Sequence, residues 1–318
     1  MDKAFESRRI VIALGGNSLG NSAEEEIKAV NSAVPFLLEL AKMGHQLVIT
    51  HGNGPQVGMF QNALRLAHGV ATRFPEINLA DSVAITEGYI GYHLMQGLQN
   101  EIIREGLPWK VAYALTRMEV DPNDPAFEEP DKPIGAFFTP KQVNEMVKQN
   151  PTLHFMEDSG RGCRRAVASP VPQKIVDIDA IMSLINAGFI TIACGGAGIP
   201  VVKEPDGTYR SMPCVLDKDY SSEMLAIACD ADLLILLTGV EHVALNFGKP
   251  NEIDLTECSV KDALRYLDEG QFGKGSMEPK VRAAVRFVQS KPGREAIIGK
   301  LDKAPEAVRG ESGTKICA

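Results

Sequence analysis

VIALGGNSLG, residues 11–20, opens the ordered part of this chain of 318 residues. Four apolar residues run directly into two glycines and an asparagine. An apolar run of this length, bounded by glycine, is typical of a buried β-strand. The turn that follows is either a plain chain reversal or a place where backbone N–H groups approach a ligand, because glycine permits both.

Two further apolar runs end in the same way. HQLVITHG (45–52) leads into Gly52-Asn53-Gly54, and ITIACGG (190–196) leads into Gly195 to Gly198. Segments with helical periodicity lie between these strands, over 22–43, 55–67 and 80–105. Strands that alternate with helices predict right-handed crossovers and a largely parallel, doubly wound sheet. Since ligands bind at the carboxyl ends of such strands, we expect the three glycine turns to share one sheet edge and to bind a phosphate-rich ligand.

The middle of the chain interrupts this alternation. Residues 121–140 are rich in proline, which excludes regular helix and central strand. We interpret residues of about 120–172 as a protruding lobe or lid, and a solvated surface insertion is the alternative. Around the lobe we expect strands over 109–120, 190–194, 232–240, 294–300 and 313–318, helices over 139–149, 174–189, 221–231, 259–270 and 279–289, and a hairpin over 203–211. The predicted division is an acceptor-binding part, 1–205, and a nucleotide-binding part, 206–318, within one compact domain.

Composition excludes several classes of function. The formal net charge of −8 gives no bulk attraction to nucleic acid or to an anionic membrane. No apolar run reaches the roughly 18 residues that span a bilayer, and the first nine residues lack the apolar core of a secretory signal. The six cysteines form no C-x-x-C pair, so we expect reduced thiols, no zinc site and a cytoplasmic location.

Three lysines stand in unusual contexts. Lys218 lies between Asp217 and Asp219, and flanking acids can hold an ammonium in place. Lys280 follows Gly275-Ser276 and a proline, and Lys132 lies in DKPIG within the proline-rich segment. Phosphoryl transfer needs such cations around the transferring group, whereas an arbitrary lysine is a solvated surface residue. The chain contains neither a P-loop nor the protein-kinase motifs.

A cluster of arginines follows the lobe segment. EDSGRGCRR, residues 157–165, contains Arg161, Arg164 and Arg165. The cluster either binds an anion or forms a basic hairpin paired with the neighbouring acids.

The motifs taken together resemble one family. ALGGNSL, THGNGPQVG, TEGYIGY, DPAFEEPDKPIG, EDSGRG, GGAGIPVV, LDKDYSSE, LTGVEHVALNFGKP and GSMEPKV follow one another from about Arg9 to Gly313. This order is similar to that of the carbamate kinases, members of the amino acid kinase family. The resemblance implies a three-layer αβα sandwich with a mostly parallel sheet of about eight strands, a protruding lobe and a homodimer. It also implies the reaction ATP + carbamate ⇌ ADP + carbamoyl phosphate, with Mg²⁺ carried on the nucleotide and no metal site on the protein.

The resemblance also implies roles for individual residues. The predicted substrate-binding residues are Gly15, Gly16, Asn17, Gly52, Asn53 and Gly54. The predicted catalytic residues are Lys132, Lys218, Asp219 and Lys280. The predicted nucleotide-binding residues are Thr238, Gly239, Val240, Val243, Ser276, Met277 and Lys280. Two alternatives stay open at the level of sequence: a kinase of the same fold for another small carboxylate- or phosphonate-like acceptor, and a non-catalytic sensor of nucleotide or carbamoyl phosphate.

Overall fold

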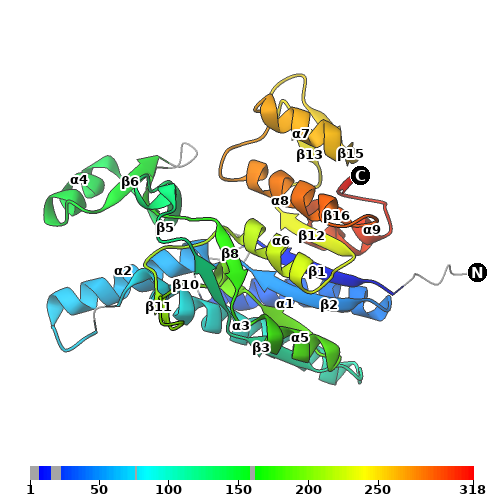
Figure 1. Cartoon of the computed structure of the whole chain (residues 1–318), viewed down its shortest axis with the longest axis horizontal. Helices are drawn as coiled ribbons and strands as arrows, with labels where there is room; N and C mark the ends of the chain where they lie inside the picture. The colour runs from blue at the N-terminus through cyan, green and yellow to red at the C-terminus, as the bar shows by residue number, and fades with distance from the viewer. Residues whose placement is uncertain (1–6, 16–22, 76, 158–161) are drawn as a thin grey trace, which may run out of the picture.

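A central sheet of eight strands organises the molecule (Figure 1). The computed structural model describes residues 7–15, 23–75, 77–157 and 162–318. The strand order is β15-β17-β16-β12-β1-β2-β9-β3, and every pair is parallel except β16 with β17. The strands are β1 (Arg9–Leu14), β2 (Gln46–His51), β3 (Val111–Ala114), β9 (Ile190–Ala193), β12 (Leu233–Thr238), β15 (Glu257–Ser259), β16 (Glu295–Lys300) and β17 (Thr314–Cys317). The predicted mostly parallel sheet of about eight strands is therefore confirmed.

Helices cover both faces of the sheet. Side chains alternate along each strand, so Ile10 and Ile12 of β1 face one core while Val11 and Ala13 face the other. Because both faces are buried, the strands are apolar throughout rather than alternating with polar residues. The first core is covered by α1 (Ala23–Lys42), α3 (Leu79–Arg104) and α9 (Ala304–Val308), and the second by α5 (Ile178–Asn186), α6 (Lys218–Ala228), α7 (Val260–Asp268) and α8 (Met277–Gln289).

A second sheet of four strands lies beside the main one. Its order is β11-β10-β4-β8, formed by β4 (Arg117–Val120), β8 (Pro172–Ile175), β10 (Ile199–Lys203) and β11 (Tyr209–Ser211). The antiparallel pairing of β10 with β11 confirms the predicted hairpin.

Two predicted segments differ from the structure. The strand expected over 109–120 is divided between β3 and β4, because the chain leaves the main sheet near Thr116, whose N–H donates to a carboxylate of α3. The helix expected from 174 begins only at Ile178, since Lys174 and Ile175 belong to β8.

The proline-rich segment forms a lobe that projects from the body (Figure 1). It contains a three-stranded antiparallel sheet of order β5-β7-β6 and the helix α4 (Pro140–Gln149). The strands are β5 (Lys132–Phe138), β6 (His154–Glu157) and β7 (Cys163–Val167). The lobe thus brings three strands and a helix to one side of the main sheet. A short 3₁₀ turn (Pro125–Phe127) precedes β5 within this segment.

Four short elements complete the chain outside the lobe. They are η3 (Gly195–Ala197), η4 (Leu301–Lys303), β13 (Val243–Leu245) and β14 (Ile253–Leu255).

The lobe contacts the body where two glycines meet. Strand β5 lies against α2 (Gly54–Val70), and a Cβ atom built on Gly58 of α2 would lie 2.3 Å from the Cα atom of Gly135. Gly135 itself has φ +72°, a conformation that side chains rarely adopt. The pair therefore fixes how closely the strand that carries Lys132 approaches the body.

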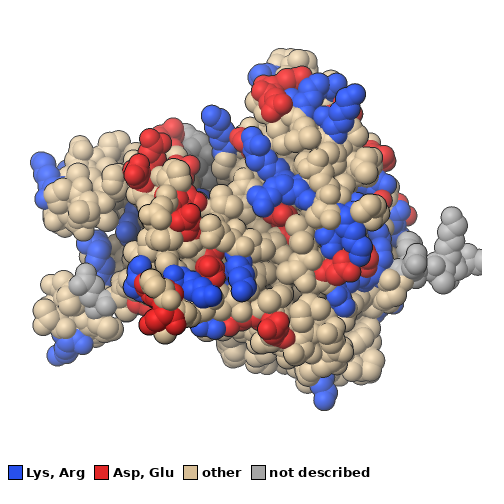
Figure 2. All heavy atoms as spheres, viewed as in Figure 1, with Lys and Arg blue, Asp and Glu red and all other residues tan. Residues whose placement is uncertain are grey.

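Surface charge is mixed on the face drawn in Figure 2, where basic and acidic side chains lie among one another. None of the described helices is both long enough and apolar enough to cross a membrane.

The glycine contact yields a test of stability. We expect Gly58→Ala to lower the free energy of unfolding by about 1–3 kcal/mol, because the added methyl group meets backbone atoms. Gly69→Ala, on the same helix with open space around its Cα, is the matched control and should be neutral or stabilising by up to about 1 kcal/mol. Urea unfolding measures both. Equal stability of the two variants would contradict the proposed contact.

Candidate active site

The carboxyl ends of four neighbouring strands open into one cleft. Gly15 follows β1, Gly52 follows β2, Gly196 follows β9, and Thr238 ends β12. All four residues line the cleft, which confirms that the glycine turns share one sheet edge. Gly54 and Asn53 line it too, at the N-terminus of α2, where free backbone N–H groups favour anions. The predicted substrate-binding residues Gly16 and Asn17 lie outside the described residues.

The turn after β9 is built for close approach. Gly196 has φ +59°, and a Cβ atom there would lie 2.4 Å from Nδ2 of Asn53. That amide donates a hydrogen bond to Oγ1 of Thr86 on α3, at 2.8 Å. The side chain of Asn53 therefore lies between the turn after β9 and α3, and only glycine at position 196 leaves room for it.

A buried carboxylate lies at the centre of the cleft wall. Asp219, in the first turn of α6, is 4% exposed. Its Oδ1 accepts a hydrogen bond from Nζ of Lys218 at 2.8 Å, and its Oδ2 accepts one from Nζ of Lys280 at 2.8 Å. Lys280, on α8, also donates to the carbonyl oxygen of Ser276. One carboxylate thus holds two ammonium groups from two helices.

These contacts shift the pKa values of the partners. Burial alone would raise the pKa of Asp219, but the charges of Lys218 and Lys280 hold it well below its usual range. Burial lowers the pKa of Lys218, and the charge of Lys280 adds to that effect, while Asp219 opposes both. Asp219 is therefore ionised at every physiological pH.

The third lysine comes from the lobe. Nζ of Lys132, the first residue of β5, donates to Oδ2 of Asp217. Asp217 also caps α6, because its Oδ1 accepts the N–H of Asp219 at 2.8 Å. The sequence pattern assigned both flanking acids to Lys218, whereas the structure pairs Asp217 with Lys132. Burial disfavours the charge of Lys132, but Asp217 outweighs that effect and raises the pKa.

The arginine cluster contributes one residue that sequence reasoning did not place. Arg164 lies on β7 and lines the cleft, where its Nε donates to the carbonyl oxygen of Gly135 at 2.9 Å. Its guanidinium carbon lies 5.4 Å from the ring centroid of Phe137. Arg165 lines a separate pocket, because successive side chains of a strand point to opposite faces. Strands β6 and β7 pair antiparallel on either side of residues 158–161, so Arg161 and the expected pairing with Asp158 lie outside the described residues. Strand alternation separates Arg164 from Arg165, but it does not by itself say which of the two faces the cleft.

The predicted nucleotide-binding residues divide into two groups. Thr238, Gly239, Ser276 and Lys280 line the cleft. Val240 and Met277 do not line it. Val243 is 1% exposed and packs in the second core, so its side chain is unavailable to a ligand in this conformation.

The cleft carries an excess of positive charge. The described residues that line it include four basic side chains, Lys132, Arg164, Lys218 and Lys280, and two acidic ones, Asp217 and Asp219. Such a cleft binds anionic groups and stabilises negative charge that develops during a reaction. Within the described part of the chain, no three His, Cys, Asp or Glu side chains gather closely enough to hold a metal ion.

Two buried side chains, those of His51 and Glu87, pack against Gly195 of the turn after β9. The position of a Cβ atom on Gly195 lies 2.4 Å from Nε2 of His51 and 2.9 Å from Cγ of Glu87. Burial lowers the pKa of His51 to about 4, although its Nδ1 contacts the carbonyl oxygen of Gly52 at 3.2 Å. Burial raises the pKa of Glu87 well above its usual range, although it accepts the N–H of Thr116 at 3.0 Å. His51 is therefore uncharged near neutral pH, and burial disfavours the charged form of Glu87.

Known proteins share both the sequence pattern and the fold. The model of the "Amino acid kinase family" matches residues 8–300. The chain belongs to the amino acid kinase family.

Several known proteins are similar to this chain along nearly their whole length. Carbamate kinase-like protein YqeA of Escherichia coli is 47% identical over 98% of this chain and 99% of its own. The carbamate kinase of Clostridium perfringens is 44% identical over 97% of this chain and 99% of its own. Carbamate kinase from Giardia lamblia bound to AMP-PNP superposes with a TM-score of 0.88 at 35% identity, covering 98% of both chains.

The buried histidine gives this amino acid kinase a testable pH dependence. Between pH 6.5 and about 4 the unfolded chain binds a proton at His51 that the folded chain does not, so stability falls as the pH falls. From pH 7 to pH 5 we expect the native protein to lose roughly 2 kcal/mol more stability than His51→Gln. Urea unfolding at both pH values measures the difference. Parallel pH dependence of the two proteins would show that His51 is not buried as a neutral group.

Proposed function

We propose that this chain is a carbamate kinase that catalyses ATP + carbamate ⇌ ADP + carbamoyl phosphate. The observation that carries the proposal is the set of three lysines held by two aspartates at the carboxyl edge of the sheet. The relatives that carry the name carbamate kinase, at 44% identity and over nearly full length, support the choice of acceptor.

The acceptor end of the cleft is assigned to the glycine turns. Gly15, Gly52, Asn53 and Gly54 lie where backbone N–H groups and the N-terminus of α2 can bind carbamate and the transferring phosphoryl group. We include Gly16 and Asn17 in this set on the resemblance alone. Lys132 of the lobe then contacts the carbamoyl phosphate oxygens from the opposite wall.

The phosphoryl group is assigned to the lysines of α6 and α8. Lys218 and Lys280 supply positive charge close to the three equatorial oxygens of the transferring group. These oxygens carry its negative charge in the transition state. Asp219 acts as a positioning residue, because each of its oxygens holds one ammonium group at 2.8 Å. Preplaced charge of this kind needs no rearrangement at the moment of reaction.

The nucleotide is assigned to the end of the cleft near β12 and α8. Thr238, Gly239 and Ser276 line it there, and Lys280 follows one turn into the helix. We assign Val240 and Met277 to the nucleotide by resemblance only. Mg²⁺ enters with the nucleotide, whose phosphate oxygens are the hard ligands that this cation prefers. Asp217 and Asp219 are already engaged by lysines, so they fit a role in holding those lysines better than a resident metal site.

The reaction requires no general base from the protein. The attacking carbamate oxygen is already anionic, and His51 is buried behind the turn as a neutral group. Catalysis then consists of positioning and electrostatic stabilisation, which this cleft can supply.

Three wider features belong to the same proposal. We expect the enzyme to be cytoplasmic, as its unpaired cysteines suggest, and to be a homodimer, as the resemblance implies. We also expect it to run toward ATP, using carbamoyl phosphate formed in the catabolism of arginine or a similar nitrogen source.

The proposal is tested by coupled detection of ATP from ADP, Mg²⁺ and carbamoyl phosphate. We expect Lys218→Met to lower kcat by about 10²–10³-fold, because a preplaced charge on the transferring group is removed. Lys203→Met, at an exposed position of β10, is the matched control and should retain full activity.

Two outcomes would contradict the proposal. Absence of ATP above background, with ligand-induced thermal stabilisation retained, would favour a non-catalytic sensor. Turnover of ATP with a different small acid but not with carbamate would favour another acceptor.

A further inference from the structure

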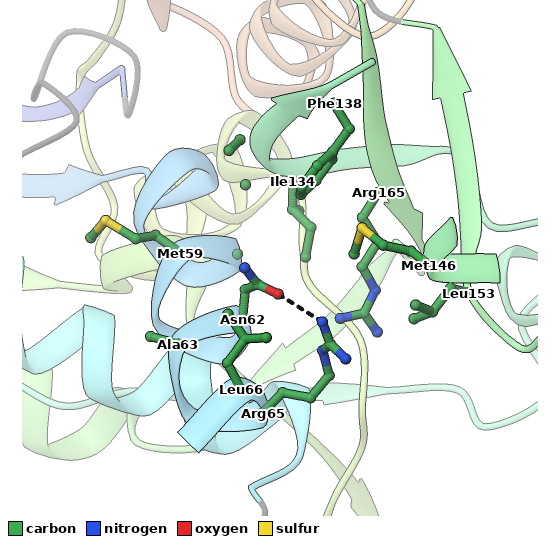
Figure 3. Close-up of a pocket in the computed structure, with 13 residues that line it drawn as sticks. Met59, Asn62, Ala63, Arg65, Leu66, Ile134, Phe138, Met146, Leu153 and Arg165 are labelled. Carbon is green, nitrogen blue, oxygen red and sulfur yellow. Dashed lines mark hydrogen bonds between the residues drawn. The ribbon is translucent and has the colours of Figure 1, made fainter. Parts of the chain in front are cut away.

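A second pocket lies outside the cleft, between α2 and the lobe (Figure 3). Its volume is about 260 Å³, close to the lower limit for small-molecule sites. Helix α2 forms one wall, while β5, α4, Leu153 and Arg165 of the lobe form the other. The lining residues are Gly58, Met59, Asn62, Ala63, Arg65, Leu66, Ile134, Gly135, Ala136, Phe138, Met146, Leu153 and Arg165.

Most of this lining is apolar. Met59 and Leu66 line the pocket from α2, and Phe138, Met146 and Leu153 line it from the lobe. The unbranched thioether side chains of Met59 and Met146 adapt to ligands of different shape. The walls are therefore suited to the apolar body of a small organic molecule.

Two guanidinium groups interrupt the apolar lining. Arg65 extends from α2 and Arg165 from β7, and Figure 3 shows their ends directed toward one another. Burial lowers the pKa of Arg165, and the positive charge of Arg65 lowers it further. The two like charges therefore lie close enough to repel each other.

The partners of these arginines are neutral amides. Arg65 Nη2 donates to Oδ1 of Asn62 at 3.1 Å, and Arg165 Nη1 donates to Oε1 of Gln61 at 2.5 Å. Among the residues that the structure describes, neither guanidinium forms an ion pair with a carboxylate. Guanidinium groups bind carboxylates in a forked geometry, and a partly buried pair without a counter-charge gains most from such a ligand.

We propose that this pocket binds a small organic carboxylate with an apolar body, held by Arg65 and Arg165. The carboxylate would neutralise the two guanidiniums, and the body would fill the space between α2 and the apolar side chains of the lobe. The proposal stands apart from the reaction assigned to the cleft. It has one connection with it, since Ile134 lines both cavities and Lys132 lies two residues away on β5. A ligand in the pocket therefore contacts the strand that carries the lysine of the lobe.

Binding is tested without turnover, by ¹⁹F NMR of 4-(trifluoromethyl)benzoate titrated with the full-length protein. We expect saturable binding that Arg65→Gln and Arg165→Gln each weaken at least roughly tenfold, because each removes one forked contact. The uncharged amide of the same probe should bind at least roughly tenfold more weakly. Ala63→Trp fills the pocket with both arginines in place and should also abolish binding.

Two matched variants separate this pocket from other sites. Arg210→Gln removes an exposed arginine that pairs with Glu204, and Lys280→Gln removes a cation of the cleft. Both should bind the probe as the native protein does. The proposal is overturned by the absence of saturable binding, by equal binding of the amide, by undiminished binding in the arginine or Ala63→Trp variants, or by loss of binding in Lys280→Gln.

Discussion

The two hydrogen bonds that Asp219 accepts from Lys218 and Lys280 are the constraint on which the cleft depends. Three positive side chains cannot be collected at one sheet edge unless carboxylates offset their repulsion and their burial. Asp219 does so within the first turn of α6, where the helix N-terminus also favours a negative charge. It thereby ties α6 to α8, which pack against each other over the second core. Asp217 repeats this arrangement toward the lobe through Lys132.

The main sheet and its functional edge could be predicted because their signals are local. Apolar runs that end in glycine, such as 11–16 and 190–196, mark buried parallel strands whose turns must lie at the same edge. The composition around Lys218 and Lys280 added two candidate cations, and the structure places both on one carboxylate. A resemblance over nearly the whole chain supplied the roles that spacing alone left open.

The details that sequence reasoning did not resolve depend on contacts between distant segments. Asp217 neighbours Lys218 in the chain, yet it pairs with Lys132, which lies 85 residues away. Arg164 and Arg165 are adjacent, and only the placement of β7 against β5 decides which of them enters the cleft. Val243 was predicted to bind the nucleotide, but its side chain packs in the second core. The pocket between α2 and the lobe likewise arises from the packing of Gly58 on Gly135. No local sequence pattern predicts this contact.

Asp219 and Lys280 stabilise each other across two helices. A double-mutant cycle of Asp219→Asn and Lys280→Met, measured as free energies of unfolding in urea, isolates that interaction. The partly exposed pair Glu278 and Arg282, four residues apart on α8, serves as the reference, with an expected coupling of about 0.3–0.5 kcal/mol. For the buried pair we expect a coupling of about 1–3 kcal/mol. A coupling no larger than that of the Glu278–Arg282 pair would show that Asp219 does not hold Lys280 in place.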